Sequence, residues 1–180
     1  MTVCVISPFH NVVASDSAIT KSEMMSFLGP KFLQTKDGSK IISFAGELPF
    51  IQAAQIWANT DSFDETIKVM RRTKAHKYTG EILVYHKKSQ VFWALDETLQ
   101  LLEFRAPFAA IGVGGSVCNA LMTAGLNPVD AIFYTTKTVV SCQTPIFYAT
   151  LDNVTAEHTK LADTSALERE YQLRMSINCS

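Results

Sequence analysis

The chain opens with MTVCVISPFHNVVASD (residues 1–16), in which two apolar runs flank a stretch of turn-forming residues. The runs Val3–Ile6 and Val12–Ala14 are rich in β-branched residues, and Ser7–Asn11 between them contains a proline and an asparagine. This pattern predicts a β-hairpin. Such a hairpin would hold the start of the chain in a sheet instead of leaving it frayed.

A threonine follows the first methionine, and removal of Met1 would place Thr2 at the chain terminus. A terminal threonine carries its own base, because the free α-amine has an unperturbed pKa of roughly 7.7–8.0 and can accept the hydroxyl proton near pH 7. Thr2 is therefore a candidate nucleophile that needs no histidine. The alternative is that Thr2 simply follows the start codon and has no catalytic role.

Further motifs follow in a distinctive order. Asp16 closes the predicted hairpin, Lys31 comes next, the segment 39–46 leads a strand into a helix start, and the glycine-rich AIGVGG occupies residues 110–115. The order and spacing of these motifs resemble the proteasome β-subunit and bacterial HslV family of N-terminal-nucleophile hydrolases. The resemblance covers residues 1–152, and it rests on the order of the motifs because each is short.

The resemblance implies a catalytic role for five residues. Thr2 would attack the substrate, Lys31 would lower the pKa of the terminal amine and hydroxyl, and Asp16 would orient Lys31. The backbone N–H of Gly46 would form the oxyanion hole. Ser141 would match a serine of the family that supports the catalytic residues. An ammonium favours proton loss from a neighbouring group, and a glycine lets backbone donors approach an oxyanion closely. Taken singly, each residue also has a purely structural interpretation.

Two positions depart from the family pattern. Val113 occupies the place of a serine that hydrogen-bonds near the terminal amine, and a valine side chain can neither donate nor accept. Thr138 occupies the place of an aspartate that accompanies Ser141. The resemblance therefore implies a supporting network that is only partly present.

Length and composition predict one soluble domain, and the resemblance, which ends at residue 152, implies an extension after it. The chain has 180 residues, of which 47% are hydrophobic and 18% charged, enough to bury a sizeable core. A net charge of −1 gives no reason to expect nucleic acid or an anionic membrane as a partner. No apolar stretch reaches the roughly eighteen residues of a membrane span and no secretion signal is visible, so we expect a cytoplasmic protein. We expect residues 1–152 to form the domain and 153–180 an extension.

Cysteines and histidines predict neither a metal site nor a cofactor. The four cysteines and four histidines are widely spaced, without Cys-x-x-Cys pairs or clusters of zinc-ligand spacing. They are Cys4, Cys118, Cys142, Cys179, His10, His76, His86 and His158. We expect the first three cysteines to be buried, reduced thiols and the histidines to lie on the surface or in turns.

Periodicity predicts an α+β fold. Beyond the hairpin and an irregular segment, we expect strands at 39–46, 81–85, 90–94, 101–104 and 146–150, and helices at 48–58, 63–72, 115–123 and 128–138. Ser62–Glu65 is a capping-box start, and Asn127-Pro128 opens another helix. Strands segregated from helix pairs indicate layered sheets and helices. The resemblance adds the specific arrangement, a four-layer αββα sandwich.

The extension predicts a short amphipathic helix. Thr164–Glu168 is a capping box, and Leu167, Tyr171, Leu173 and Met175 supply a narrow apolar stripe. This stripe would pack on its own domain or dock on a neighbouring subunit.

Two function classes remain from the sequence. In the first, the chain is a threonine-type endopeptidase subunit that acts on polypeptide within an oligomeric assembly, with an ATPase unfoldase as a partner. In the second, it is a catalytically inactive structural or binding subunit of a larger assembly, such as a viral particle, and would then reside in a virion. The second class rests on fold-level analogy alone.

Overall fold

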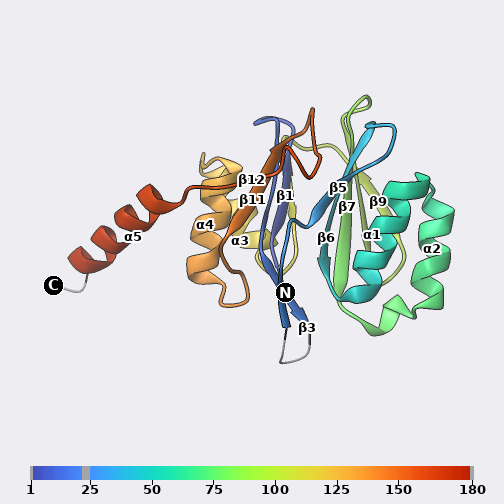
Figure 1. Cartoon of the computed structure of the whole chain (residues 1–180), viewed down its shortest axis with the longest axis horizontal. Helices are drawn as coiled ribbons and strands as arrows, with labels where there is room; N and C mark the ends of the chain where they lie inside the picture. The colour runs from blue at the N-terminus through green and yellow to red at the C-terminus, as the bar shows by residue number, and fades with distance from the viewer. Residues whose placement is uncertain (1, 22–24, 179–180) are drawn as a thin grey trace.

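Two five-stranded sheets lie face to face in the computed structural model, and a pair of helices covers the outer face of each (Figure 1). The structure describes residues 2–21 and 25–178. All strand pairs in the described part of the chain are antiparallel. The predicted α+β class and the αββα sandwich are confirmed.

The first sheet contains the predicted hairpin at its centre. Its strands lie in the order β10-β1-β2-β11-β12. They are β1 (Cys4–Ser7), β2 (Val12–Asp16), β10 (Ala109–Ile111), β11 (Ile146–Thr150) and β12 (Lys160–Leu161). Cys4 pairs with Ser15 and Ser7 with Val12, so the turn spans the proline-containing stretch. This register places Asp16 beside the start of β1.

The second sheet runs in the order β5-β6-β7-β8-β9, a simple meander from strand to strand. Its strands are β5 (Phe32–Gln34), β6 (Lys40–Gly46), β7 (Gly80–His86), β8 (Val91–Asp96) and β9 (Leu101–Phe104). Four of these were predicted, with boundaries that differ by two residues at most.

The prediction of an irregular segment between the hairpin and the strand at 39–46 is wrong in part. This segment contains a separate two-stranded ribbon, β3 (Ala18–Lys21) and β4 (Met25–Leu28), followed by β5. The strands β10 and β12 were also missed, because strands of two or three residues are too short for an alternating pattern to stand out.

The helices follow the predicted boundaries closely. They are α1 (Leu48–Thr60), α2 (Phe63–Arg72), α3 (Gly115–Thr123), α4 (Pro128–Thr138) and α5 (Ser165–Asn178), with a short 3-10 helix, η1 (Ala75–Lys77). The Ser62 hydroxyl accepts from Glu65 N at 3.3 Å and starts α2. The Asn127 side chain accepts from the backbone N–H of Val129 and Asp130 and starts α4. Local capping therefore explains why these helices begin where the sequence predicts.

Three apolar clusters hold the layers together. The cluster between the sheets includes Ile6, Val13, Ile41, Leu83 and Phe92. The cluster under α1 and α2 includes Phe50, Trp57, Met70 and Ile82, and the cluster under α3 and α4 includes Val5, Cys118, Ile132 and Phe133. Each fully buried large side chain contributes on the order of 1.5–3 kcal/mol to folding.

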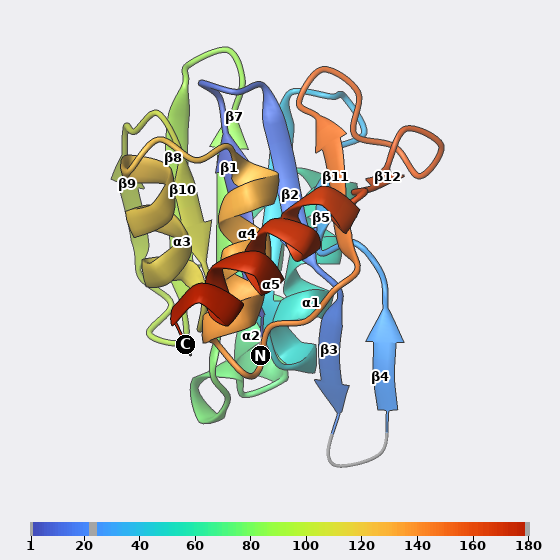
Figure 2. The same ribbon diagram turned by 90° about the vertical axis from the view of Figure 1, so that its left-hand side faces the viewer.

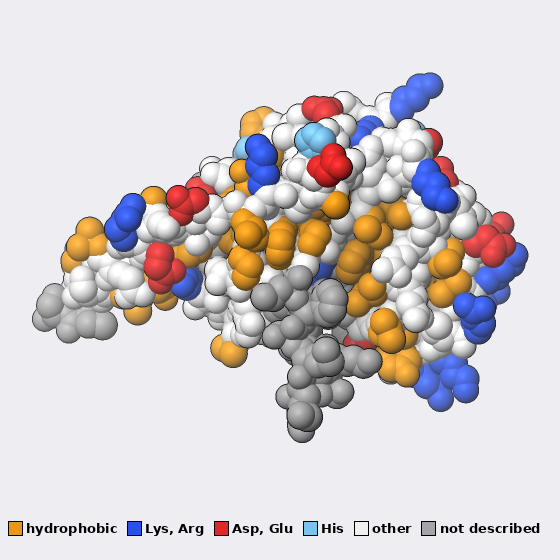
Figure 3. Space-filling model, viewed as in Figure 1, with side chains coloured by type: hydrophobic (Ala, Val, Ile, Leu, Met, Phe, Trp, Pro, Cys, Tyr) orange, Lys and Arg blue, Asp and Glu red, His pale blue; other side chains and the backbone are white. Residues whose placement is uncertain are grey.

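Helix α5 lies against α4 with its first half and extends away from the four layers with its second half (Figure 1, Figure 2). Leu167 and Tyr171 pack on the cluster under α3 and α4, and Lys137 forms a 2.5 Å ion pair with Glu168. Leu173, Met175 and Ile177 are exposed, and apolar side chains are visible along this helix in Figure 3. Within the described ranges, none of the helices is long and apolar enough to cross a membrane.

Candidate active site

Three residues from separate segments meet at one end of the first sheet. Thr2 precedes β1, Asp16 ends β2, and Lys31 precedes β5. Lys31 Nζ lies 2.7 Å from Asp16 Oδ1 and donates a hydrogen bond to Thr2 Oγ1, and Thr2 Oγ1 donates to Asp16 Oδ1. The structure thus brings together the predicted nucleophile, the predicted ammonium and the predicted carboxylate. Their catalytic roles stay predictions.

This group is shielded from water. The exposed fractions are 3% for Thr2, 0% for Asp16 and 2% for Lys31. Backbone groups complete the arrangement, because Asp16 Oδ1 accepts from Val3 N at 3.0 Å and Oδ2 accepts from Gln143 N at 3.0 Å. A buried ion pair is tolerated only when such additional hydrogen bonds satisfy it.

The surroundings of the Thr2 hydroxyl suit nucleophilic chemistry. A buried ammonium in hydrogen-bond contact stabilises negative charge that develops on Oγ1 when the hydroxyl attacks a carbonyl. The low dielectric of the site strengthens this interaction relative to water. Asp16 keeps the ammonium in place, and the Ser15 hydroxyl holds the Lys31 backbone by accepting from Lys31 N at 3.1 Å.

Gly46, the predicted oxyanion donor, ends β6 in a conformation that requires glycine. Its φ is +112°, and a Cβ at this position would lie closer than 3.0 Å to both Gly80 Cα and the Thr79 carbonyl oxygen. The next residue, Glu47, is the N-cap of helix α1. Gly46 therefore lies at a strand-to-helix turn, as the sequence predicted, while its role as a donor stays a prediction.

The glycine-rich turn contacts Thr2 directly through its backbone. Gly114 N donates to the Thr2 carbonyl oxygen at 3.3 Å. Gly112 has a φ of +88°, and a Cβ there would lie closer than 3.0 Å to the same carbonyl oxygen. Gly112 N donates in turn to Glu81 Oε2 at 2.6 Å. Sequence reasoning missed Glu81, although an acid that opens the apolar run 81–85 was a visible signal.

The other predicted positions lie outside this hydrogen-bonded group. Val113 is 46% exposed. The Thr138 hydroxyl donates to the carbonyl oxygens of Tyr134 and Thr135 in its own helix, each at 3.2 Å. Ser141 is half-buried, and in the described part of the chain its hydroxyl forms no hydrogen bond with Thr2, Asp16 or Lys31.

The cysteine thiols are weaker candidates for a nucleophile than the Thr2 hydroxyl. The cysteines Cys4, Cys118 and Cys142 are free and buried, as predicted, whereas Cys179 lies outside the described residues. Burial raises the pKa of the Cys118 thiol to about 12 and of the Cys142 thiol to about 11, and it raises the pKa of Cys4 further. These thiols stay protonated near pH 7 and are weak nucleophiles. Among the described residues, no group of three His, Cys, Asp or Glu side chains could hold a metal ion.

Comparison with known proteins supports the fold and corrects the expected family. No protein-family model and no curated protein matches the chain. The structure is similar to Anbu (ancestral beta-subunit) from Yersinia bercovieri, with a TM-score of 0.70 and 14% sequence identity over 99% of this chain and 96% of that chain. The expected membership of the proteasome β-subunit and HslV family is wrong, because Anbu, whose structure this chain resembles, is a proteasome-related protein distinct from both. The likeness shows that this chain shares the overall fold of that protein.

Proposed function

We propose that the chain is a hydrolase of peptide bonds in which Thr2, freed by removal of Met1, is the nucleophile. The observation that carries this proposal is the contact of Thr2 Oγ1 with the buried Lys31 ammonium, which Asp16 holds in place at 2.7 Å. A buried cation beside a hydroxyl near the chain start is unusual, because burying an ammonium is costly. It is the arrangement that a terminal nucleophile requires.

The reaction would proceed in two halves. Thr2 Oγ1 attacks the carbonyl carbon of the substrate while its proton passes to the free α-amine, and the carbonyl oxygen becomes an oxyanion. The Gly46 N–H is the proposed donor to that oxyanion. The intermediate collapses as the α-ammonium returns the proton to the leaving amine, which gives an ester on Thr2. Water then hydrolyses the ester and restores the hydroxyl.

The proposed enzyme works as a subunit of an assembly. Its fold is related to proteasome subunits, and the outer half of α5 exposes Leu173, Met175 and Ile177 to solvent. A helix that extends from its own domain with apolar side chains exposed is suited to contact a neighbouring subunit. Polypeptide is the proposed substrate, and an unfoldase partner remains an expectation from the sequence.

The test begins with the intact mass of the purified protein, which reports whether Met1 has been removed. Hydrolysis of a panel of fluorogenic peptides is then compared for the wild type, Thr2→Ser and Thr2→Ala. We expect Thr2→Ser to retain activity and Thr2→Ala to lose at least about a thousandfold in kcat/KM, because it lacks a nucleophile. Thr66→Ala is the matched control, since its buried hydroxyl lies outside the candidate site and donates to the carbonyl oxygen of Ser62, the N-cap of α2, at 2.8 Å. Equal turnover by wild type and Thr2→Ala would overturn the mechanism.

A second candidate function, an inactive structural subunit, is favoured by two observations. Val113 presents no polar group to the site, and the Thr138 hydroxyl is bonded within its own helix. In this case the Thr2 hydroxyl only satisfies the buried Lys31–Asp16 pair. A processed wild type without activity, combined with reduced stability of Thr2→Ala, would support this function. The variant V113S/T138D would then create activity if those two positions are where the catalytic network is incomplete.

A further inference from the structure

We propose that Glu81 is a positioning residue that fixes the glycine-rich turn 112–114 against Thr2. This inference rests on the proposed function, because it assigns Glu81 a part in placing the nucleophile. Glu81 belongs to the second sheet, whereas the turn leads from β10 of the first sheet into α3. Its side chain therefore connects the two sheets at the site.

The register of β7 explains why this carboxylate reaches the turn. Side chains alternate along a strand, so Glu81 shares a face with Leu83 and Tyr85. Leu83 and Tyr85 belong to the apolar cluster between the sheets. Glu81 is half-buried at the end of that face, and its Oε2 accepts from Gly112 N at 2.6 Å. An acidic side chain on an otherwise apolar, inward-facing row is thus accounted for by one specific backbone donor.

The turn held by Glu81 touches both parts of the candidate site. A Cβ on Gly112 would lie closer than 3.0 Å to the Thr2 carbonyl oxygen and 3.0 Å from Ala45 Cβ. Ala45 precedes Gly46, the proposed oxyanion donor. Gly114 N donates to the Thr2 carbonyl oxygen at 3.3 Å. A shift of the turn would therefore move the Thr2 backbone relative to Gly46.

Among the described residues, the other side chain that bonds to the turn is the Cys142 thiol, at the Gly114 backbone, and a thiol forms only weak hydrogen bonds. Val113 within it is apolar and exposed, and Gly112 and Gly114 have no side chains. A hydrogen bond to an ionised carboxylate is shorter and stronger than one between neutral groups. Glu81 therefore supplies from the neighbouring sheet an anchor that the turn itself lacks.

The test compares Glu81→Ala, Glu81→Gln and Glu103→Ala in the processed protein. Glu103 is the matched control, because it is a carboxylate of the same sheet that accepts a side-chain hydrogen bond elsewhere, from Trp93 Nε1 at 3.0 Å. The readouts are kcat and KM on a fluorogenic peptide, and hydrogen exchange at the Gly112 and Gly114 amides measured by NMR.

We expect Glu81→Ala to lower kcat about tenfold or more with little change in KM, because losing one such anchor misplaces the nucleophile without removing substrate contacts. Exchange at the Gly112 and Gly114 amides should accelerate about tenfold, in line with the loss of one hydrogen bond. Glu81→Gln retains an acceptor and should keep most of the kcat and most of the amide protection of the wild type. Glu103→Ala should change neither kcat nor the exchange rates.

Unchanged exchange in Glu81→Ala, or an equal effect of Glu103→Ala, would overturn the assignment. If the wild type has no hydrolytic activity, the proposed function is rejected. The exchange measurement still decides whether Glu81 fixes the turn on Thr2, because it does not depend on activity.

Discussion

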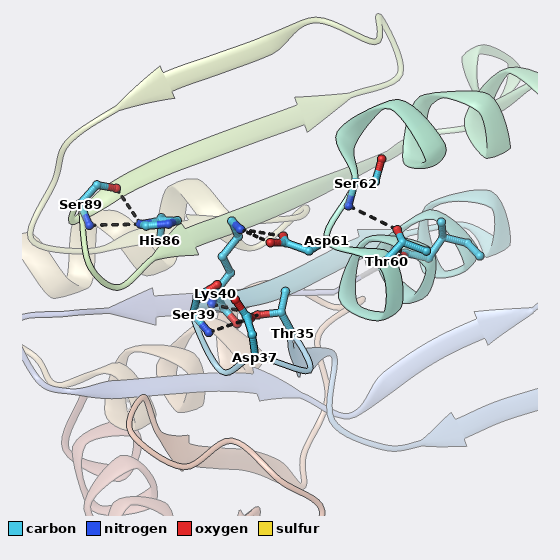
Figure 4. Close-up of polar contacts among 10 residues, drawn as sticks. Thr35, Asp37, Ser39, Lys40, Thr60, Asp61, Ser62, His86 and Ser89 are labelled. Carbon is cyan, nitrogen blue, oxygen red and sulfur yellow. Dashed lines mark hydrogen bonds and ion pairs between the residues drawn. The ribbon is translucent and has the colours of Figure 1, made fainter.

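Two lysine–aspartate pairs in this protein have the same chemistry and differ in exposure, chiefly at the aspartate. Lys31 and Asp16 lie 2.7 Å apart, with side chains that are 2% and 0% exposed. Lys40 and Asp61 lie 2.5 Å apart, with side chains that are 11% and 36% exposed (Figure 4). The first pair contacts the hydroxyl of Thr2, and the second connects the start of β6 to the end of α1.

The comparison shows how burial changes what an ion pair must do. Water reaches Asp61 of the Lys40–Asp61 pair, so we expect this pair to contribute less to stability and to tolerate the loss of its lysine better than a fully buried pair. The Lys31–Asp16 pair has exchanged water for Thr2 Oγ1 and two backbone N–H groups. A buried charge so arranged is poorly explained by stability alone, because apolar side chains of similar size can often replace a buried ion pair without loss. The nucleophilic chemistry that we propose for Thr2 would account for it.

The largest expected effect comes from breaking the buried pair. Lys31→Met keeps much of the side-chain volume but removes the ammonium from a buried carboxylate, and should lower the free energy of unfolding by about 3–5 kcal/mol. This change in the free energy of unfolding is measured by urea denaturation, with circular dichroism as the signal. A double-mutant cycle built from Lys31→Met, Asp16→Asn and the double variant should give a coupling energy between the two side chains of about 2 kcal/mol or more. A loss below about 1 kcal/mol for Lys31→Met would contradict the contrast between the pairs.

A smaller effect is expected at the solvated pair. Lys40→Met should lower the free energy of unfolding by less than about 1 kcal/mol, because Asp61 remains open to water after the ammonium is removed. The difference from wild type should shrink between low salt and 1 M salt, as ions screen the exposed carboxylate. If Lys40→Met were as damaging as Lys31→Met, burial would not be the feature that separates the two pairs.

The smallest expected effect concerns Asp37, which lies in the turn beside Lys40 (Figure 4). The hydroxyl of Thr35 donates to Asp37 Oδ1 at 2.6 Å, and Ser39 donates from its backbone N–H and its hydroxyl. These bonds hold the pKa of Asp37 well below its usual range.

A lowered pKa in the folded state stabilises the fold above the unfolded value of about 3.9, and this contribution is lost as the pH falls below it. The stability difference between wild type and Asp37→Asn should therefore be present at pH 7 and diminish below about pH 4. Thermal unfolding across this range measures it, and a difference that grows toward acid pH would refute the assignment.

Local features of the sequence predicted most of the elements. The hairpin 1–16, the capped helices α2 and α4, and strands such as β9 and β11 follow from signals within a few residues of each other. The ribbon β3–β4 and the short strands β10 and β12 could not be predicted in this way. The residues of β10 and β12 pair because the tertiary structure supplies a neighbouring strand, whereas β3 and β4 pair with each other. None of these four short strands has a composition that carries a clear pattern of its own.

The sequence by itself determined where the helices and the longer strands form, because periodicity, capping and turn residues act between residues that are close together in the chain. It also indicated Thr2, Asp16 and Lys31 as a group through a resemblance whose family assignment proved wrong. Only the tertiary structure decided that Lys31 meets Thr2 across 29 residues and that Glu81 meets Gly112 across 31. Contacts of this kind depend on the packing of two sheets, in which burial and register select partners that no local pattern specifies.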